Sequence, residues 1–161
     1  MRVKLQRSLS AALTVTALLW GATLQSATIQ WVEPQFITTG EFQRISEFFT
    51  GKENTSGRAI LRTQADERDG LYFIIKLDTP ASQFPDGASL KLDLVTTARK
   101  DVITYTLPIN SSQSDGRTML VGFTGSDWRG PGIRPLAWHV TLVDAKGATL
   151  TEHKSFLWEM P

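Results

Sequence analysis

Alternation of apolar and polar residues over short runs is the feature that most limits what this chain can fold into. Between residues 71 and 78 every second residue is apolar, whereas Lys76 and Asp78 belong to the opposite face. The same period of two recurs at residues 90–94 and, more briefly, at 119–123. Because successive side chains of an extended strand point to opposite faces, each run predicts a strand with one buried face.

Three more runs have the length and composition of strands. Residues 59–63, 102–107 and 136–143 are rich in β-branched and aromatic side chains. Turn-forming pairs such as Asp69-Gly70 and Lys146-Gly147 separate the candidates. Short strands without intervening helices predict an all-β fold in which antiparallel sheets form a sandwich or barrel.

The C-terminal hairpin is the unit that the sequence defines best. Residues 136–144 and 148–158 flank a three-residue loop that ends in Gly147, at the position where such loops need a left-handed backbone. Pairing outward from this loop sets Leu142 opposite Leu150, so apolar residues meet on one face.

The same register has further consequences along the hairpin. It sets Leu136 opposite Phe156 and places Trp138 on the inward face. It would also turn Glu152 and Lys154 inward, where charges are costly. We therefore expect a bulge, or the edge of the core, near these two residues.

The hairpin carries a resemblance to a known architecture. Residues 138–147 read WHVTLVDAKG and residues 155–158 read SFLW. They resemble the last hairpin of exported bacterial domains with immunoglobulin or fibronectin type III folds. The resemblance implies an antiparallel immunoglobulin-like β-sandwich of about seven to eight strands. Such hairpins serve many functions, so the resemblance assigns no functional residue.

Residues 38–51 allow two interpretations. A capping box begins at Thr38 and includes Glu41, apolar residues follow at helical spacing, and Gly51 is placed to end a helix. Phe, Ile and Thr are also strand formers, and the all-β context favours extended chain. We expect a first strand with a bulge here, with the helix as the alternative.

Residues 1–26 have the composition of a secretory signal peptide. A basic start is followed by an uncharged apolar run at residues 9–20 and by small residues near Ser26 and Ala27. That run is shorter than the roughly 20 apolar residues that a spanning helix needs, although an uncleaved anchor is the alternative. We expect cleavage here, and a single domain at 27–161 that resides in the periplasm or outside the cell.

Composition then excludes several classes of protein. Beyond residue 26 the chain holds 14 Lys and Arg against 16 Asp and Glu, which argues against a nucleic-acid partner. The absence of cysteine excludes a lipoprotein anchor, disulfides and thiolate chemistry. No second apolar stretch is long enough to span a membrane, so we expect no membrane span in the mature form.

The loop at residues 124–135 is the strongest candidate for binding. It is long for a connection between strands, and long loops on a rigid sandwich often carry binding residues. Trp128 beside Asp127 and Arg129 suits either a sugar ring or a partner protein of the cell envelope. The alternative is that the tryptophan folds back over the open end of the core, as a single loop tryptophan does more often.

The two histidines are the candidate metal ligands. The predicted register makes His139 and His153 direct neighbours on the outward face, where both could reach one transition metal. Their outward neighbours supply no third strong ligand, which favours the alternative of two solvated imidazoles.

No catalytic motif accompanies these residues. Ser126-Asp127 lacks the turn that exposes a nucleophilic serine, and the acidic residues Asp66, Glu67 and Asp69, with Arg68 among them, lack the spacing of a calcium loop. Asn54 and Asn110 begin glycosylation patterns, which matter only in a host that uses them. We expect an exported, non-enzymatic binding or accessory module without a cofactor. The alternatives are a carbohydrate-binding module, and a metal-binding protein or enzyme that uses His139 and His153.

Overall fold

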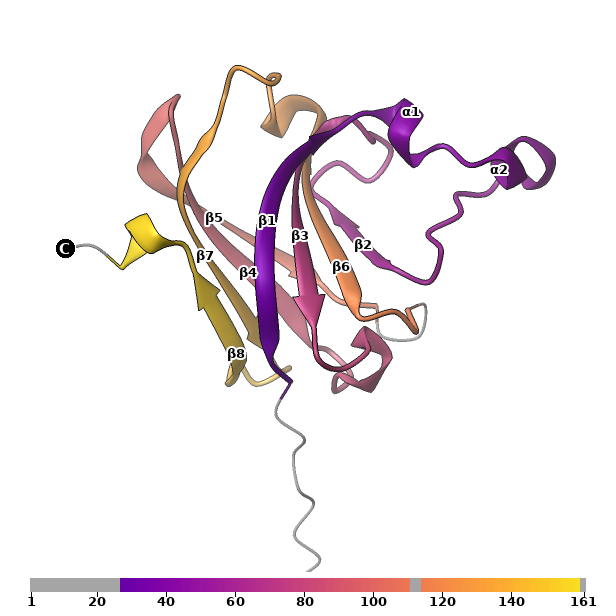
Figure 1. The fold of residues 1–161 in the computed structure, drawn as a ribbon. Coiled ribbons are helices and arrows are strands. Elements are labelled where there is room, and N and C mark those ends of the chain that lie inside the picture. The colour runs from indigo at the N-terminus through magenta and orange to yellow at the C-terminus, as the bar shows by residue number, and fades with distance from the viewer. Residues whose placement is uncertain (1–26, 111–113, 160–161) are drawn as a thin grey trace, which may run out of the picture.

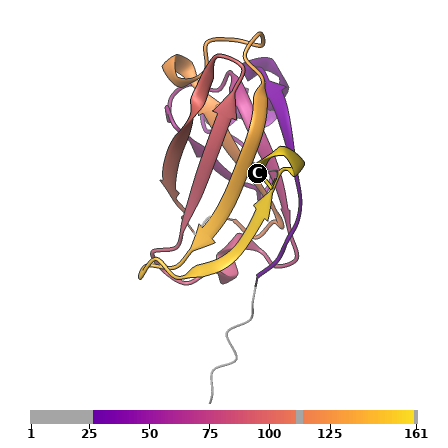
Figure 2. The ribbon, with the colours of Figure 1, turned by 90° about the vertical axis from the view of Figure 1, so that its left-hand side faces the viewer.

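Two β-sheets packed face to face form the body of the molecule (Figure 1). The structure is a computed structural model that describes residues 27–110 and 114–159, so the predicted signal peptide lies outside the described residues. The first sheet has the order β1 (Ile29–Ile37), β3 (Gly70–Leu77), β6 (Thr118–Thr124) and β2 (Ala59–Arg62). The second has the order β5 (Arg99–Pro108), β4 (Ser89–Thr96), β7 (Pro135–Val143) and β8 (Thr149–Lys154), and it faces the viewer in Figure 2. The prediction of an all-β sandwich is confirmed.

The core lies between the sheets and is built by the alternation seen in the sequence. Side chains from β3 and β4 fill it, and the strand residues that the period of two predicts as inward are at most 4% exposed: Leu71, Phe73, Ile75, Leu77, Leu90, Leu92 and Leu94. Aromatic rings then join the two sheets. Phe73 of β3 meets Trp138 of β7 edge to face at 5.9 Å between ring centroids.

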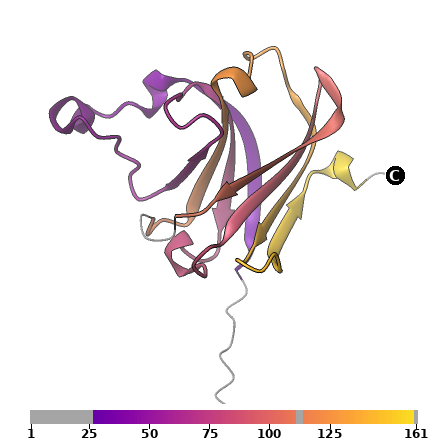
Figure 3. The same ribbon diagram turned by 180° about the vertical axis from the view of Figure 1, so that it is seen from behind.

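Pairing is antiparallel throughout the second sheet, and one pair in the first sheet is parallel. β2 runs parallel to β6, whereas β3 pairs antiparallel with both β1 and β6. The chain therefore crosses from one edge of this sheet to the other between β1 and β2. That crossover, residues 38–58, leaves the sandwich and projects from it (Figure 3).

The crossover corrects one expectation. The first strand is β1, upstream of residues 38–51, and those residues form two short helices, α1 (Thr39–Phe42) and α2 (Ile45–Thr50). The Thr38 N–H donates to the Glu41 carboxylate at 2.7 Å, which is half of the capping box. Gly51 ends α2 with φ of +65°. The strand prediction was wrong because this segment passes outside the sheet, where local capping decides its conformation.

The register of the C-terminal hairpin is also corrected. Val143 pairs with Thr149 as predicted, but Leu142 pairs with Thr151, so Leu150 forms a bulge. Every pair farther from the turn is shifted by one residue, which turns Glu152 outward. The bulge thus avoids burying charge, but it lies closer to the turn than expected.

The shift also moves the end of the hairpin. β8 stops at Lys154, and the next residues form a 3-10 helix, η4 (Phe156–Trp158). Phe156 is 78% exposed, so the predicted contact with Leu136 is wrong. Among the described residues, none of the helices is long and apolar enough to cross a membrane.

Candidate functional site

A pocket of about 360 Å³ opens at one end of the sandwich. It is lined by residues of the turn between β4 and β5 and of the loop between β6 and β7, and these two segments lie at the top of Figure 2. Its polar lining includes Arg99, Tyr105, Asp127 and Arg129, and its apolar lining includes Phe123 and Trp128. This volume lies within the range of about 300 to 1,000 Å³ that is typical of small-ligand sites.

The loop that forms one wall is held in place by hydrogen bonds. It begins with a short 3-10 helix, η3 (Gly125–Asp127), and the Asp127 carboxylate accepts a hydrogen bond from the Gln64 side chain at 3.0 Å. Near its other end the Arg134 N–H donates to the Thr97 hydroxyl at 3.0 Å. The loop between β6 and β7 is therefore fixed to its neighbours at both ends, which positions its side chains before any ligand arrives.

Trp128 belongs to the core as well as to the pocket. Its side chain is only 6% exposed and packs in the main hydrophobic cluster, so it covers the open end of the sandwich. Its indole Nε1–H is buried and has no hydrogen-bond partner among the residues that the structure describes. Trp128 is thus a wall of the pocket with an unused donor, and the exposed stacking ring that a sugar platform needs is not formed.

Charge in the pocket is predominantly positive. Arg99 and Arg129 oppose the single carboxylate of Asp127. Burial raises the pKa of Tyr105, and the nearby Asp127 carboxylate raises it further, while Arg99 partly opposes this. Tyr105 therefore stays protonated at neutral pH, and its ring packs edge to face on Phe123 at 4.5 Å between centroids. The arrangement suits a ligand with an acidic group, because guanidinium groups pair with carboxylates and phosphates.

Three predicted residues and two unpredicted ones meet here. Asp127, Trp128 and Arg129 all line the pocket, as a single loop allows. Arg99 and Tyr105 come from β5 and were missed. The sequence holds no signal for them, because their position opposite the loop follows from how the second sheet packs on the first.

The two histidines are not brought together. His139 lies on the outward face, where its Nε2 is 2.9 Å from a Glu152 carboxylate oxygen. His153 pairs with Val140 and stacks on the Trp138 ring at 5.6 Å between centroids, which places it on the core side. The predicted opposition of the two rings was wrong because the bulge shifts the register. No group of three or more metal-binding side chains occurs in residues 27–110 and 114–159.

The acidic loop before β3 has structural partners. Asp69 accepts hydrogen bonds from the Thr39 side chain and from the Thr39 N–H at the start of α1, and these lower the pKa of Asp69. Arg68 pairs with Glu47 at 2.7 Å. Ser126 lines the pocket, but His139 does not. The geometry therefore gives no support to a catalytic serine arrangement.

These features define a class: a cysteine-free, all-β sandwich with a ligand-sized, positively charged pocket at its loop end. Comparison with protein families, curated proteins and solved structures finds no match to this chain.

Proposed function

We propose that this protein is an exported, non-enzymatic binding module with an immunoglobulin-like fold, and that its loop-end pocket binds an acidic glycan of the cell envelope. The observation that carries the proposal is the meeting of Arg99 and Arg129 with aromatic walls in one pocket. The packing of two four-stranded sheets, with the last hairpin noted above, supports the immunoglobulin-like assignment.

The lining favours a glycan because of the kind of contacts it offers. Phe123 and Trp128 supply apolar wall area without a stacking platform, so recognition would depend on polar groups: guanidinium groups, the Tyr105 hydroxyl and the Asp127 carboxylate can hydrogen-bond to sugar substituents. The excess of positive charge selects an acidic sugar over a neutral one.

The composition of residues 1–26 supports action outside the cytoplasm. A leader of this kind directs export, and we place the mature protein in the periplasm or outside the cell. N-terminal sequencing of the protein isolated from its own cells and medium tests this. Cleavage after Ser26 or Ala27 supports export, and an intact leader argues against it.

Isothermal titration calorimetry with envelope glycans tests the pocket. We expect acidic oligosaccharides to bind and neutral ones of equal length to bind far more weakly. Arg99→Ala and Arg129→Ala should each weaken binding by about tenfold, which corresponds to about 1.4 kcal/mol.

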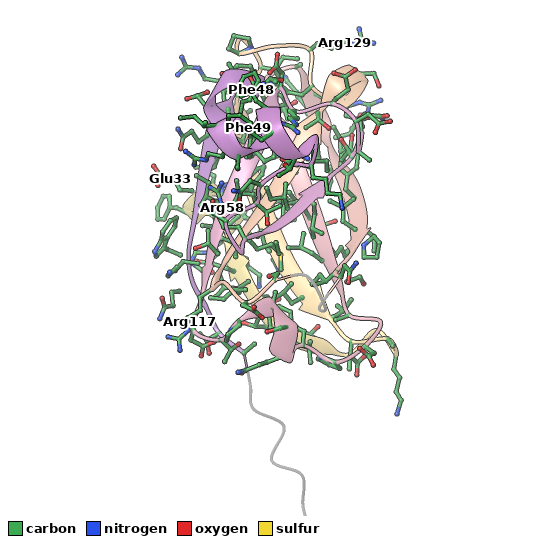
Figure 4. The ribbon with its side chains drawn as sticks, turned by 90° about the vertical axis from the view of Figure 1, so that its right-hand side faces the viewer. Glu33, Phe48, Phe49, Arg58, Arg117 and Arg129 are labelled. Atoms are coloured by element: carbon green, nitrogen blue, oxygen red, sulfur yellow. The ribbon has the colours of Figure 1, made fainter. Side chains whose placement is uncertain are left out.

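Arg117→Ala is the matched control. Arg117 is also exposed, and it lies at the opposite end of the sandwich from Arg129 (Figure 4). Binding should be unchanged in this variant. No heat of binding with any acidic glycan, or an equal loss in Arg117→Ala, contradicts the proposal.

A further inference from the structure

The helix α2 is amphipathic in the reverse of the usual sense. Its only buried residue is acidic, since Glu47 is 9% exposed. Its large apolar residues face solvent: Ile45 is 79% exposed, Phe48 74% and Phe49 85%. Because these three residues are spaced at i, i+3 and i+4, they share one face of the helix. Exposed apolar patches of this kind mark interaction sites in soluble proteins.

Hydrogen bonds and an ion pair fix the inner side of this helix. The Glu47 carboxylate accepts from Arg68 Nη1 at 2.7 Å and from the Asn54 N–H at 3.1 Å. These interactions lower the pKa of Glu47, the Arg68 hydrogen bond most of all. The Asn54 side chain also donates to the Ser46 hydroxyl at 2.9 Å. The helix is therefore held with its apolar face outward.

A second ion pair fixes the segment that returns from the helix to the sheet. Arg62 of β2 donates to both oxygens of Glu53, at 2.5 and 2.7 Å, and its Nε donates to the Tyr72 hydroxyl at 2.8 Å. The same guanidinium lies over the Phe42 ring at 5.0 Å. Arg62 thus joins α1, the returning segment and the outer face of the first sheet.

The projecting crossover, residues 38–58, is called the arm below, and α2 lies at its tip. The two ion pairs leave this tip positively charged. Glu47 and Glu53 are neutralised by arginines from the body of the molecule. Arg44 and Lys52 flank α2, are exposed, and have no ion pair within the described part of the chain. Phe48 and Phe49 lie on the arm that projects from the sandwich, as Figure 4 shows looking onto it. The tip therefore combines a convex apolar surface with two free cations.

A lipid surface fits this combination better than a protein groove. Helices that dock in protein grooves use apolar residues over two or more turns, whereas α2 has 6 residues. A bilayer needs no complementary cavity and accepts a convex apolar wedge at its interface, and anionic headgroups attract the flanking cations.

We propose that α2, with Arg44 and Lys52, inserts its Ile45, Phe48 and Phe49 side chains into the interface of an anionic lipid bilayer. This surface is separate from the glycan pocket and adds a second partner to the proposed binding function. Three side chains and two cations give reversible attachment, because firm anchoring takes a longer apolar segment or acyl chains.

Vesicle sedimentation tests the proposal with the mature protein purified after removal of residues 1–26, since that basic and apolar segment could itself bind vesicles. We expect binding to vesicles of phosphatidylcholine with phosphatidylglycerol, and several-fold weaker binding to phosphatidylcholine alone. Binding should fall as salt is raised. The double variant Phe48→Ser/Phe49→Ser should reduce binding by at least about tenfold while keeping the β-sheet circular dichroism spectrum.

Two matched controls make the result specific. Phe156→Ser removes a similarly exposed phenylalanine from η4, which lies near the C-terminus on the opposite side of the sandwich from α2 (Figure 1), and it should leave binding unchanged. Arg44→Glu/Lys52→Glu should abolish the preference for anionic vesicles, whereas Lys146→Glu in the exposed β7–β8 turn should not.

Three outcomes would overturn the proposal. The first is no binding to anionic vesicles. The second is binding that persists in Phe48→Ser/Phe49→Ser, since that variant keeps every other apolar segment. The third is a dimer seen by light scattering that this variant dissociates without any vesicle binding, which would assign the patch to a second copy of the chain. Glycan calorimetry is independent of all three.

Discussion

A single glycine decides how closely the outer face of the first sheet can be packed. Gly122 of β6 lies against the buried Tyr72 ring, and a Cβ at this position would be 2.4 Å from a ring carbon. The Tyr72 hydroxyl donates to the Arg68 carbonyl at 2.8 Å, and its ring is fully buried and packs on Phe42, so moving the ring away would disturb these contacts. Glycine here is therefore a packing requirement.

We predict that Gly122→Ala lowers the free energy of unfolding by about 1 to 3 kcal/mol, because it overpacks the site. Urea denaturation measures the change. Gly132→Ala is the control, since no atom lies within 4 Å of its added Cβ, and it should change stability little. Equal effects of the two substitutions would refute the packing argument.

The ion pair between Arg62 of β2 and Glu53 joins the arm to the first sheet. The Arg62 side chain is 7% exposed and that of Glu53 is 24% exposed. Removing one partner of a buried pair leaves the other uncompensated, and partial exposure of Glu53 reduces that cost.

We expect Glu53→Gln to lower the free energy of unfolding by about 2 kcal/mol. Glu33→Gln, at an exposed position on β1 without a described ion pair, should change it by less than about 0.5 kcal/mol. Chemical denaturation of both variants measures the difference. If Glu53→Gln left the free energy of unfolding unchanged, other contacts would hold the arm.

At the scale of single strands, the alternation specifies which face is buried. In β4 the leucines at 90, 92 and 94 are at most 1% exposed, while Lys91 between them is exposed and pairs with Asp93 at 3.1 Å. The helix α2 breaks the usual pattern for helices, since its apolar residues do not pack on the body. The pattern of apolar and polar residues thus explains which side chains of β4 are buried. It fails for α2, the element that we assign to membrane binding.

We predict that Phe73→Ala or Leu92→Ala lowers the free energy of unfolding by about 2 to 5 kcal/mol, since each leaves a cavity between the sheets. Lys91→Ala should cost less than about 1 kcal/mol, because Lys91 itself is exposed and the buried Asp93 carboxylate keeps the hydrogen bond from the Thr104 hydroxyl. Thermal or urea unfolding compares them. A similar loss at Lys91 and Leu92 would contradict the packing of β4.

At the scale of the whole molecule, the crossover between β1 and β2 is held to the sandwich by carboxylates. Hydrogen bonds from Arg68 and Arg62 hold the pKa values of Glu47 and Glu53 below the ordinary value of 4.5. The helices of the crossover lie toward the end of the sandwich that carries the β6–β7 loop (Figure 1), and residues of that loop line the pocket. Attachment to a bilayer through α2 would therefore leave the pocket near the membrane surface.

Acid should weaken the interactions that hold the crossover between β1 and β2 to the sandwich. A carboxyl whose pKa is lowered by folding stabilises the fold above its unfolded pKa, and that contribution is lost as the pH falls through the folded pKa. We therefore expect the free energy of unfolding to decrease as the pH falls through and below about 4.5, the ordinary pKa of these carboxyls. Urea titrations at each pH measure it. Glu47→Gln/Glu53→Gln should show a shallower dependence, and an unchanged slope would assign the acid sensitivity to other carboxylates.

The sequence by itself determined the class of fold, the presence of strands β2 to β8, and the inward residues of β3 and β4, but it missed β1. It also placed Asp127, Trp128 and Arg129 on one loop. All of these inferences were possible because they depend only on residues close together along the chain. The tertiary structure decided that Arg99 and Tyr105 join that loop, that Leu150 bulges and separates His139 from His153, and that α2 faces outward. Each of these depends on contacts between distant segments, and a local pattern carries no information about which distant partner a residue will meet.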